Sequence, residues 1–272
     1  MNKTITSVHN PKVKEWAELL GKKGRDEQGR FLVEGVHLVK EALRSGADVE
    51  CVAYADDRPL PPELHEYRGQ VCEWISVSES ILARCTSTQT PQGVFAIVRK
   101  ALPSADRLWQ QEQPLVVLLD GVQDPGNVGT IIRSAEASGA TGIIIGRGSA
   151  DLYNPKTVRA SMGSMFRLPV LEGDLLPYLR EARSRGIHVV STGLENARSC
   201  YELDWRQPLW FVVGNEGAGV SDAVGAEVDE RITIPMQGRT ESLNVAMATT
   251  VLLFEAMRQR MLSPNKNSCP RS

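Results

Sequence analysis

The sequence predicts an α/β protein made of a small N-terminal unit and a larger C-terminal unit built on a parallel sheet. Strand-like and helix-like segments alternate along most of the 272 residues, a pattern that favours a sheet covered by helices. Apolar runs after residue 114 are nearly continuous, as in parallel strands buried on both faces. Between the two regions lies the polar segment KALPSADRLWQQEQP, whose two prolines indicate a linker.

The N-terminal region is expected to alternate helical segments with four strands. The first helix should begin at Asn10–Pro11, because asparagine caps helices and proline suits the first helical position. The polar stretch RDEQG is expected to be a loop, and HLVKEALRSG a helix that ends at Gly46. The expected strands are rich in β-branched and aromatic residues: FLVEG, VECVAYA, VCEWISV and VFAIVRK.

The C-terminal region is expected to supply the larger sheet. Its strands are PLVVLLDG, GIIIGRG, LPVLEG, HVVSTGLE, LWFVVGNEG and RITIPM. Helices are expected over residues 127–138, 155–165, 175–184 and 242–261, with Ser242 capping the last one and Asn244 inside its first turn. The expected organisation is a domain over 1–100, a linker over 101–113, a domain over 114–262 and a disordered tail over 263–272.

The composition indicates an ordinary globular protein and argues against several classes. Hydrophobic residues make up 42% of the chain, and its formal net charge of -2 is not that of a generally basic nucleic-acid binder. The five cysteines form no CxxC pair, which argues against a disulfide framework and a zinc site. The start MNKTITSVHN lacks an apolar signal region, and the apolar stretch near 245–257 is too short to cross a bilayer. A cytoplasmic protein is therefore expected.

Three glycine-containing segments follow expected strands, where ligands bind in open α/β sheets. They are LDGVQDPGNVGTIIR from Leu119, VVGNEGAGVS from Val212 and IPMQGRTESLNVAMA from Ile234. Each segment alone has a simpler explanation, since glycines make turns and Asn127 suits a helix cap. Three such segments in one domain favour a common ligand site.

The motifs that are missing narrow the chemistry of that site. The sequence contains no GxxxxGK[ST], no GxGxxG after a strand, no HExxH and no GxSxG. The four histidines stand apart from the three segments, so histidine base catalysis and metal chemistry are not expected. The polar residues that remain suit orienting a substrate and binding charge: Asn127, Arg133, Asn215, Glu216, Ser242 and Asn244.

The three segments resemble, in order, the motifs of the SpoU family of RNA 2'-O-ribose methyltransferases, which belongs to the knotted SPOUT superfamily. RASMGSMFRLPV, between the first two, is also similar to the family. At the front, ITSVHNPKVK, GRFLVEG and TPQGVFAIV resemble the small L30e-like RNA substrate-binding domain that many members carry. The resemblance implies S-adenosylmethionine as cofactor, a ribose 2'-hydroxyl as acceptor and a deep trefoil knot in the C-terminal domain. It also implies a homodimer, formed through the knotted domain, whose active site uses both chains. Neither a metal nor a membrane partner is expected, on the residue patterns described above.

The resemblance also assigns the site residues by position. The catalytic positions match Arg133, Asn127, Glu216, Ser242 and Asn244. The cofactor positions match Thr192, Gly193, Leu194, Gly214, Asn215, Gly217, Gly219, Ile234, Met236 and Leu243. Two roles remain open for Arg133. Its charge holds a phosphate and the emerging alkoxide, or a dry and crowded site lets it accept the hydroxyl proton.

The RNA contacts and the RNA itself are less well defined by the sequence. Lys22, Lys23, Arg25 and Arg30 are candidates to contact RNA phosphates, with a solvated charged surface as the alternative. The two-domain layout favours 23S ribosomal RNA over transfer RNA. A non-catalytic RNA-binding or ribosome-assembly protein on the same scaffold is the main rival, and the retained polar residues argue against it. An NAD- or nucleotide-binding enzyme is disfavoured because GxGxxG is missing.

Overall fold

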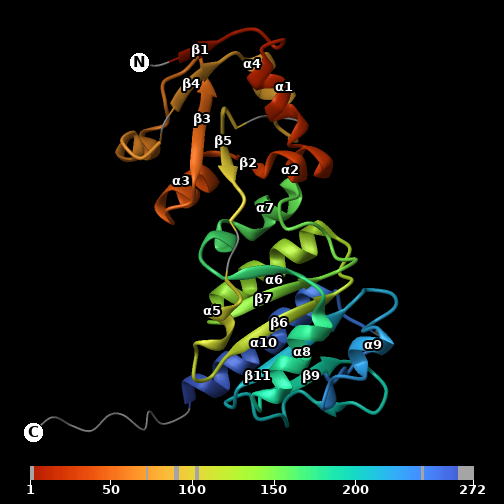
Figure 1. Cartoon of the computed structure of the whole chain (residues 1–272). Coiled ribbons are helices and arrows are strands. Elements are labelled where there is room, and N and C mark those ends of the chain that lie inside the picture. The colour runs from red at the N-terminus through yellow and green to blue at the C-terminus, as the bar shows by residue number, and fades with distance from the viewer. Residues whose placement is uncertain (1–2, 72, 89–91, 102–103, 240–241, 263–272) are drawn as a thin grey trace, which may run out of the picture. The chain divides into compact units, whose positions relative to one another are not determined.

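The computed structural model describes residues 3–71, 73–88, 92–101, 104–239 and 242–262 (Figure 1). The chain forms two compact units, each described separately below. The first comprises Met1–Leu102 and Asp151–Arg167, and the second comprises Pro103–Ala150 and Leu168–Ser272. The expected tail over 263–272 lies outside the described residues.

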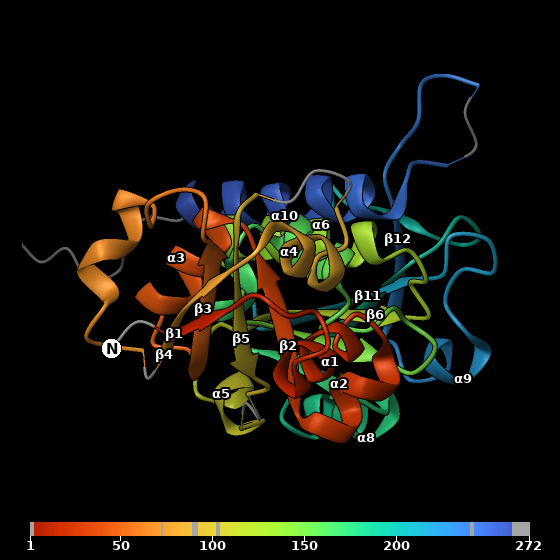
Figure 2. The same ribbon diagram turned by 90° about the horizontal axis from the view of Figure 1, so that it is seen from above.

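The first unit contains a five-stranded mixed sheet in the order β1-β4-β3-β5-β2. Strand β5 runs antiparallel to both of its neighbours, and the other pairs are parallel. The strands β3, β5 and β2 lie side by side in Figure 2. All four expected strands are confirmed and β1 is an addition: β1 (Lys3–Ile5), β2 (Arg30–Glu34), β3 (Val49–Ala55), β4 (Glu73–Val77) and β5 (Val94–Arg99).

Helices cover both faces of this sheet. Helices α1 and α4 bury Trp16, Ile81 and other apolar residues in one cluster with the strands, while α3 packs against β2, β3 and β5 outside that cluster. The Asn10 side chain caps α1 by accepting from the Lys12 backbone N–H at 2.9 Å, as expected. The helical segments are α1 (Pro11–Glu18), α2 (Lys22–Gln28), α3 (Val36–Arg44), α4 (Glu79–Cys85), α7 (Pro155–Ser161) and the 3-10 turns η1 (Pro62–Tyr67) and η2 (Ser164–Phe166).

The prediction of a loop at RDEQG is wrong, because Arg25–Gln28 belong to α2 and Gly29 caps its C-terminal end. The reason is tertiary: the Arg25 side chain is only 2% exposed and forms an ion pair with Asp151 at 2.6 Å. It also donates to the carbonyl oxygens of Leu19 and Leu20, at 2.8 and 2.9 Å. The segment 151–167 was expected within the C-terminal domain, whereas here its contacts group it with the first unit.

We expect Arg25→Ala to lower the free energy of unfolding by about 3 kcal/mol, because it leaves the Asp151 carboxylate, 10% exposed, without its buried partner. Chemical denaturation measures the change. Lys23→Ala, an exposed change on the same helix, is the control and should shift stability by less than about 0.5 kcal/mol. Equal stability of Arg25→Ala and wild type would rule out a stabilising ion pair.

The second unit contains a seven-stranded sheet in the order β10-β12-β9-β11-β6-β7-β8. Every strand pair is parallel, which confirms the expected parallel sheet. The short β10 is an addition to the expected set. The strands are β6 (Leu115–Asp120), β7 (Gly142–Gly146), β8 (Val170–Gly173), β9 (His188–Thr192), β10 (Arg198–Ser199), β11 (Leu209–Gly214) and β12 (Glu230–Thr233).

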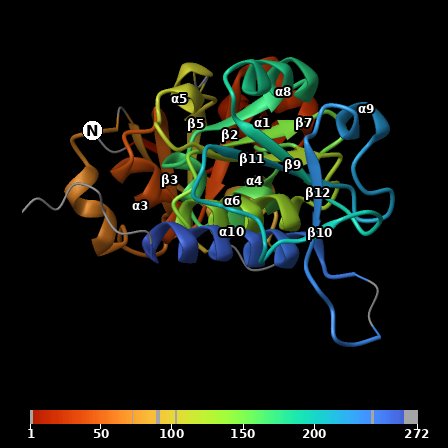
Figure 3. The same ribbon diagram turned by 90° about the horizontal axis from the view of Figure 1, so that it is seen from below.

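Helix α8 covers one face of this sheet, and α6 and α10 pack together on the other (Figure 3). The bounds of α8 agree with the expected 175–184, whereas α6 begins two residues earlier than expected and α10 three residues later. The expected linker contains a short helix, α5. The helices are α5 (Asp106–Trp109), α6 (Pro125–Ala137), α8 (Leu175–Ser184), α9 (Asp222–Gly225) and α10 (Val245–Leu262).

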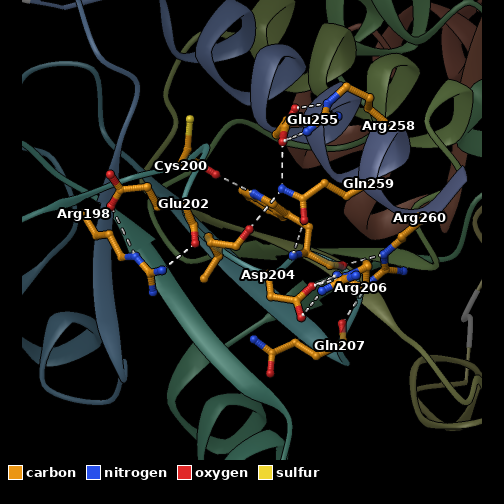
Figure 4. A network of polar contacts seen from close by, with 12 residues as sticks. Arg198, Cys200, Glu202, Asp204, Arg206, Gln207, Glu255, Arg258, Gln259 and Arg260 are labelled. Atoms are coloured by element: carbon orange, nitrogen blue, oxygen red, sulfur yellow. Dashed lines mark hydrogen bonds and ion pairs between the residues drawn. The ribbon is translucent and has the colours of Figure 1, made fainter. Parts of the chain in front are cut away.

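The C-terminal half of α10 is held by a polar network to the chain that precedes β11 (Figure 4). The guanidinium of Arg260 donates to the carbonyl oxygens of Trp205 at 2.8 Å and Gln207 at 3.0 Å, and burial lowers the pKa of Arg260. The Glu255 carboxylate accepts from Arg258 at 2.7 Å, and this hydrogen bond lowers the pKa of Glu255. The contacts of Arg260 anchor the far end of the helix whose first turn reaches the site described next.

Candidate active site

A cavity of about 200 Å³ lies at the carboxyl ends of β9, β11 and β12, where the sequence placed ligand binding. Because these strands are close in the parallel sheet, the loops that follow them meet at one edge. Gly217 excepted, every residue that the resemblance assigned to the cofactor lines this cavity. The lining residues are Thr192, Gly193, Leu194, Val213, Gly214, Asn215, Glu216, Gly219, Ile232, Thr233, Ile234, Met236, Ser242, Leu243, Val245, Ala248 and Leu252.

The loop after β11 depends on a glycine at position 214. A Cβ atom there would lie 2.2 Å from the carbonyl carbon of Gly219 and 2.3 Å from the backbone nitrogen of Val220. The two ends of the loop are joined by hydrogen bonds between the backbones of Asn215 and Gly219, at 2.9 and 3.0 Å. Gly219 has φ +72°, which favours glycine, whereas a Cβ on Gly217 would meet only the Asn215 side chain at 3.6 Å. Of Gly214 and Gly217, only Gly214 therefore lies too close to neighbouring backbone to carry a Cβ atom.

Asn215 shapes this loop. Its Oδ1 accepts from the backbone N–H groups of Gly217 and Ala218, both at 2.9 Å, and its Nδ2 donates to the Gly121 carbonyl at 2.8 Å. The amide is thus engaged with the chain, although the residue lines the cavity. We assign Asn215 to holding the loop and joining it to the end of β6.

Three of the expected catalytic residues form one hydrogen-bonded row. Asn127 Nδ2 donates to Glu216 Oε1 at 2.9 Å, and Asn244 Nδ2 donates to Asn127 Oδ1 at 3.1 Å. The explanation of Asn127 as a mere helix cap is wrong, because Asp124 caps α6 by accepting from the Asn127 backbone N–H at 2.9 Å. The Asn127 side chain is therefore available to join the loops that carry Glu216 and Asn244.

The start of α10 differs from the prediction. Asn244, and not Ser242, caps the helix: its Oδ1 accepts from the backbone N–H groups of Ala246 at 3.0 Å and Met247 at 3.3 Å. Asparagine at this position is therefore explained by capping as well as by the bond to Asn127. Ser242 lies before the helix and lines the cavity.

Arg133 stands apart from this row. It lies on α6, is exposed, and does not line the cavity. Among the residues that the structure describes, its guanidinium has no hydrogen-bond or ion-pair partner. Its charge is consequently available to a ligand or to another chain.

The candidates for RNA contact in the first unit separate into two groups. Lys22 and Lys23 are exposed at the start of α2, and Lys23 has only a loose ion pair with Glu27 at 3.8 Å. The prediction that Arg25 contacts RNA phosphates is wrong, because its side chain is buried and forms an ion pair with Asp151. Arg30 is 21% exposed and already pairs with Glu15 and Glu50, each at 3.1 Å.

The described residues contain no cluster of His, Cys, Asp and Glu that could hold a metal ion, and none of their helices is long and apolar enough to cross a membrane. Cys51, Cys85 and Cys200 are free and buried. Burial raises the pKa of the first two thiols to about 12 and that of Cys200 to about 11, so they are poor nucleophiles at neutral pH.

Two family models match the chain. The model of the SpoU rRNA Methylase family matches residues 114–254, which include all three loop segments. The model of the MRM3-like substrate binding domain matches residues 10–96. The expected linker lies between the two matched ranges.

Similar proteins match nearly end to end. A Bacillus subtilis protein named 23S rRNA (guanosine(2553)-2'-O)-methyltransferase RlmP is 38% identical over 93% of this chain and 98% of its own. A Streptomyces viridochromogenes 23S rRNA (uridine(2479)-2'-O)-methyltransferase is 36% identical over 94% and 92%. Among solved structures, the SpoU methyltransferase AviRb of Streptomyces viridochromogenes with AdoMet has a TM-score of 0.86 at 35% identity, covering 93% of this chain and 99% of that one. An AdoMet-bound rRNA methyltransferase from Sinorhizobium meliloti has the same TM-score and identity, over 94% and 97%.

Proposed function

Because the chain belongs to the SpoU rRNA methylase family, we propose that it methylates a ribose 2'-hydroxyl of 23S ribosomal RNA with S-adenosylmethionine as the methyl donor. The observation that carries the proposal is the cavity at the strand ends, bordered by the hydrogen-bonded row of Asn127, Glu216 and Asn244. Relatives that match over 93% and 94% of the chain are named for 23S rRNA, which favours this RNA over transfer RNA. Since ribosomal RNA is the substrate, we place the reaction in the cytoplasm.

The described residues of the cavity fit S-adenosylmethionine. Aliphatic side chains such as Leu194, Ile234 and Leu243, with the backbone of the glycine-containing loops, suit an adenosine ring and an alkyl chain. Glu216 is the single charged side chain among the described lining residues, and its carboxylate favours a bound cation. When bound, S-adenosylmethionine supplies an electrophilic methyl group on a sulfonium centre.

The residues beside the cavity orient the acceptor. In our proposal Asn127, Glu216 and Asn244 hold the ribose hydroxyl through the row of hydrogen bonds, and Ser242 adds a hydroxyl at the cavity wall. Arg133 stabilises the neighbouring phosphate and the developing alkoxide by its positive charge. In the single chain this guanidinium is exposed and has no partner among the described residues, so its donors are available to that phosphate.

The homodimer implied by the family resemblance is part of the proposal. Met247, Phe254 and Met261 are 66%, 42% and 74% exposed, and their seven-residue intervals place them on one stripe of α10. Helix α6, which carries Arg133, packs beside α10. A second copy docked on this face covers the apolar stripe and provides a cavity for Arg133, which does not line the cavity of its own chain.

The trefoil knot and the domain division are proposals as well. In support of the knot, the chain after β12 lines one cavity, through Ile234, Met236, Ser242 and Leu243, together with the loops that follow β9 and β11. Along the sequence we keep an L30e-like RNA-binding domain over 1–100, a linker over 101–113 and a catalytic domain over 114–262, although the contacts of residues 151–167 group them with the first unit. Lys22 and Lys23 remain the proposed phosphate contacts of the first domain.

The proposal is tested by incubating the protein with methyl-labelled S-adenosylmethionine and, separately, 23S rRNA and tRNA transcripts that lack modifications. We expect label in 23S rRNA at one alkali-resistant ribose, with tRNA unlabelled. Label in tRNA alone would show that the substrate is tRNA and not 23S rRNA. Cofactor binding without label, with intact ribosomal subunits also tried, would favour the non-catalytic RNA-binding alternative, and no cofactor binding would reject the methyltransferase.

A further inference from the structure

We propose that Arg147, on the loop after β7, binds a phosphate of the RNA strand next to the target ribose and so positions the acceptor. The inference rests on the proposed function, but it concerns a loop outside the three segments that resemble the family motifs. Strand β7 is the hydrogen-bonded neighbour of β6, so Arg147 follows the strand beside the one that leads to Asn127.

The loop that carries Arg147 is held against the end of β6. A Cβ on Gly146 would lie 2.6 Å from the Leu119 carbonyl oxygen, so only glycine allows this approach. Gly148 has φ +84°, which also favours glycine. Ser149 Oγ accepts from the Val122 backbone N–H at 3.1 Å, and the Ala150 backbone N–H donates to the Val122 carbonyl at 2.8 Å. The arginine thus has a rigid backbone on both sides.

The end of β6, against which the Arg147 loop is held, is in turn joined to the loop after β11 by two hydrogen bonds. The Gly121 carbonyl accepts from Asn215 Nδ2 at 2.8 Å, and Asp120 Oδ2 accepts from the Ser221 backbone N–H at 2.7 Å. The loops after β7, β6 and β11 therefore form one interlocked rim. A phosphate bound by Arg147 is held at a set position relative to the cofactor cavity, which is what an acceptor needs.

The charge of Arg147 is uncommitted. The side chain is exposed, and within the described ranges it has no ion pair or hydrogen bond. Six other arginines of this unit are instead paired with carboxylates: Arg180, Arg183, Arg185, Arg198, Arg206 and Arg258. A planar guanidinium with all its donors available matches a phosphate, and RNA brings phosphates to this rim.

The test compares Arg147→Ala with Arg147→Lys and with Arg107→Ala. Arg107 is an exposed arginine on α5, where Leu108 packs against Gly142 at the opposite end of β7, so it controls for loss of surface charge. We measure kcat and KM for 23S rRNA, the Kd for S-adenosylmethionine, and RNA affinity by filter binding at several salt concentrations.

For Arg147→Ala we expect the RNA KM to rise about tenfold, the cofactor Kd to stay unchanged, and the slope of log affinity against log salt to fall by about 0.7. Arg147→Lys should recover part of the lost RNA affinity, since lysine keeps the positive charge but lacks the planar set of donors that a guanidinium presents to a phosphate. An unchanged KM and salt slope, or an equal effect of Arg107→Ala, would overturn the inference. If the wild-type protein methylated no RNA, the proposed function would be rejected. The RNA affinity of Arg147→Ala in filter binding would then still test whether Arg147 binds an RNA phosphate.

Discussion

Arg133→Ala is expected to lower kcat for RNA methylation at least about 100-fold while the Kd for S-adenosylmethionine changes less than about threefold. The reason lies in two properties of the side chain. It carries an uncommitted positive charge, which suits a phosphate and a developing alkoxide, and it does not line the cavity of its own chain. Removing it therefore takes away stabilisation of the reacting centre and leaves the cofactor contacts in place. Single-turnover methylation and calorimetric cofactor binding measure the two quantities.

Arg133→Lys separates charge from geometry, because lysine keeps the charge and loses the planar fork. We expect its kcat to lie between those of wild type and Arg133→Ala. A loss of cofactor binding in Arg133→Ala would contradict the assignment to the acceptor side. Near-normal turnover of Arg133→Ala would show that Arg133 takes no part in the reaction.

The second large effect is expected at Gly214. A Cβ at this position would lie 2.2–2.3 Å from backbone atoms of Gly219 and Val220, and backbone cannot turn aside as a flexible side chain does. Gly214→Ala must therefore open the loop that Asn215 and Gly219 close, and this loop lines the cavity. Overpacking costs about 1–3 kcal/mol, which corresponds to about 5–150-fold in cofactor affinity, and we expect the upper end. Calorimetric titration with S-adenosylmethionine measures it, with circular dichroism to report folding.

Gly217→Ala is the matched control in the same loop. A Cβ there meets only the Asn215 side chain, at an ordinary contact distance of 3.6 Å. We expect its cofactor affinity to stay within about threefold of wild type. If both variants lost affinity equally, the loop would be sensitive to any added methyl group, and the close approach at Gly214 would not be the cause.

Local patterns in the sequence were sufficient for most elements. The capping residue Asn10 predicted the start of α1, and the apolar run PLVVLLDG predicted the position of β6. Both are features of a few neighbouring residues. The bounds of α8 followed from its helical periodicity. Helix α2 could not be predicted in this way, because its sequence is polar and its order depends on Arg25 pairing with a residue 126 positions away.

The sequence by itself determined the alternating α/β order, the parallel C-terminal sheet and, through the resemblance, the family and the residue types of the site. Only the tertiary structure decided how those residues are used. It joined Asn127 to Glu216 and Asn244, which lie 89 and 117 positions away, made Asn244 the cap of α10, and removed Arg25 from the candidates for RNA contact. The physical reason is that periodicity and capping act over a few residues, whereas a buried ion pair or a hydrogen bond between loops depends on which strands the sheet sets side by side.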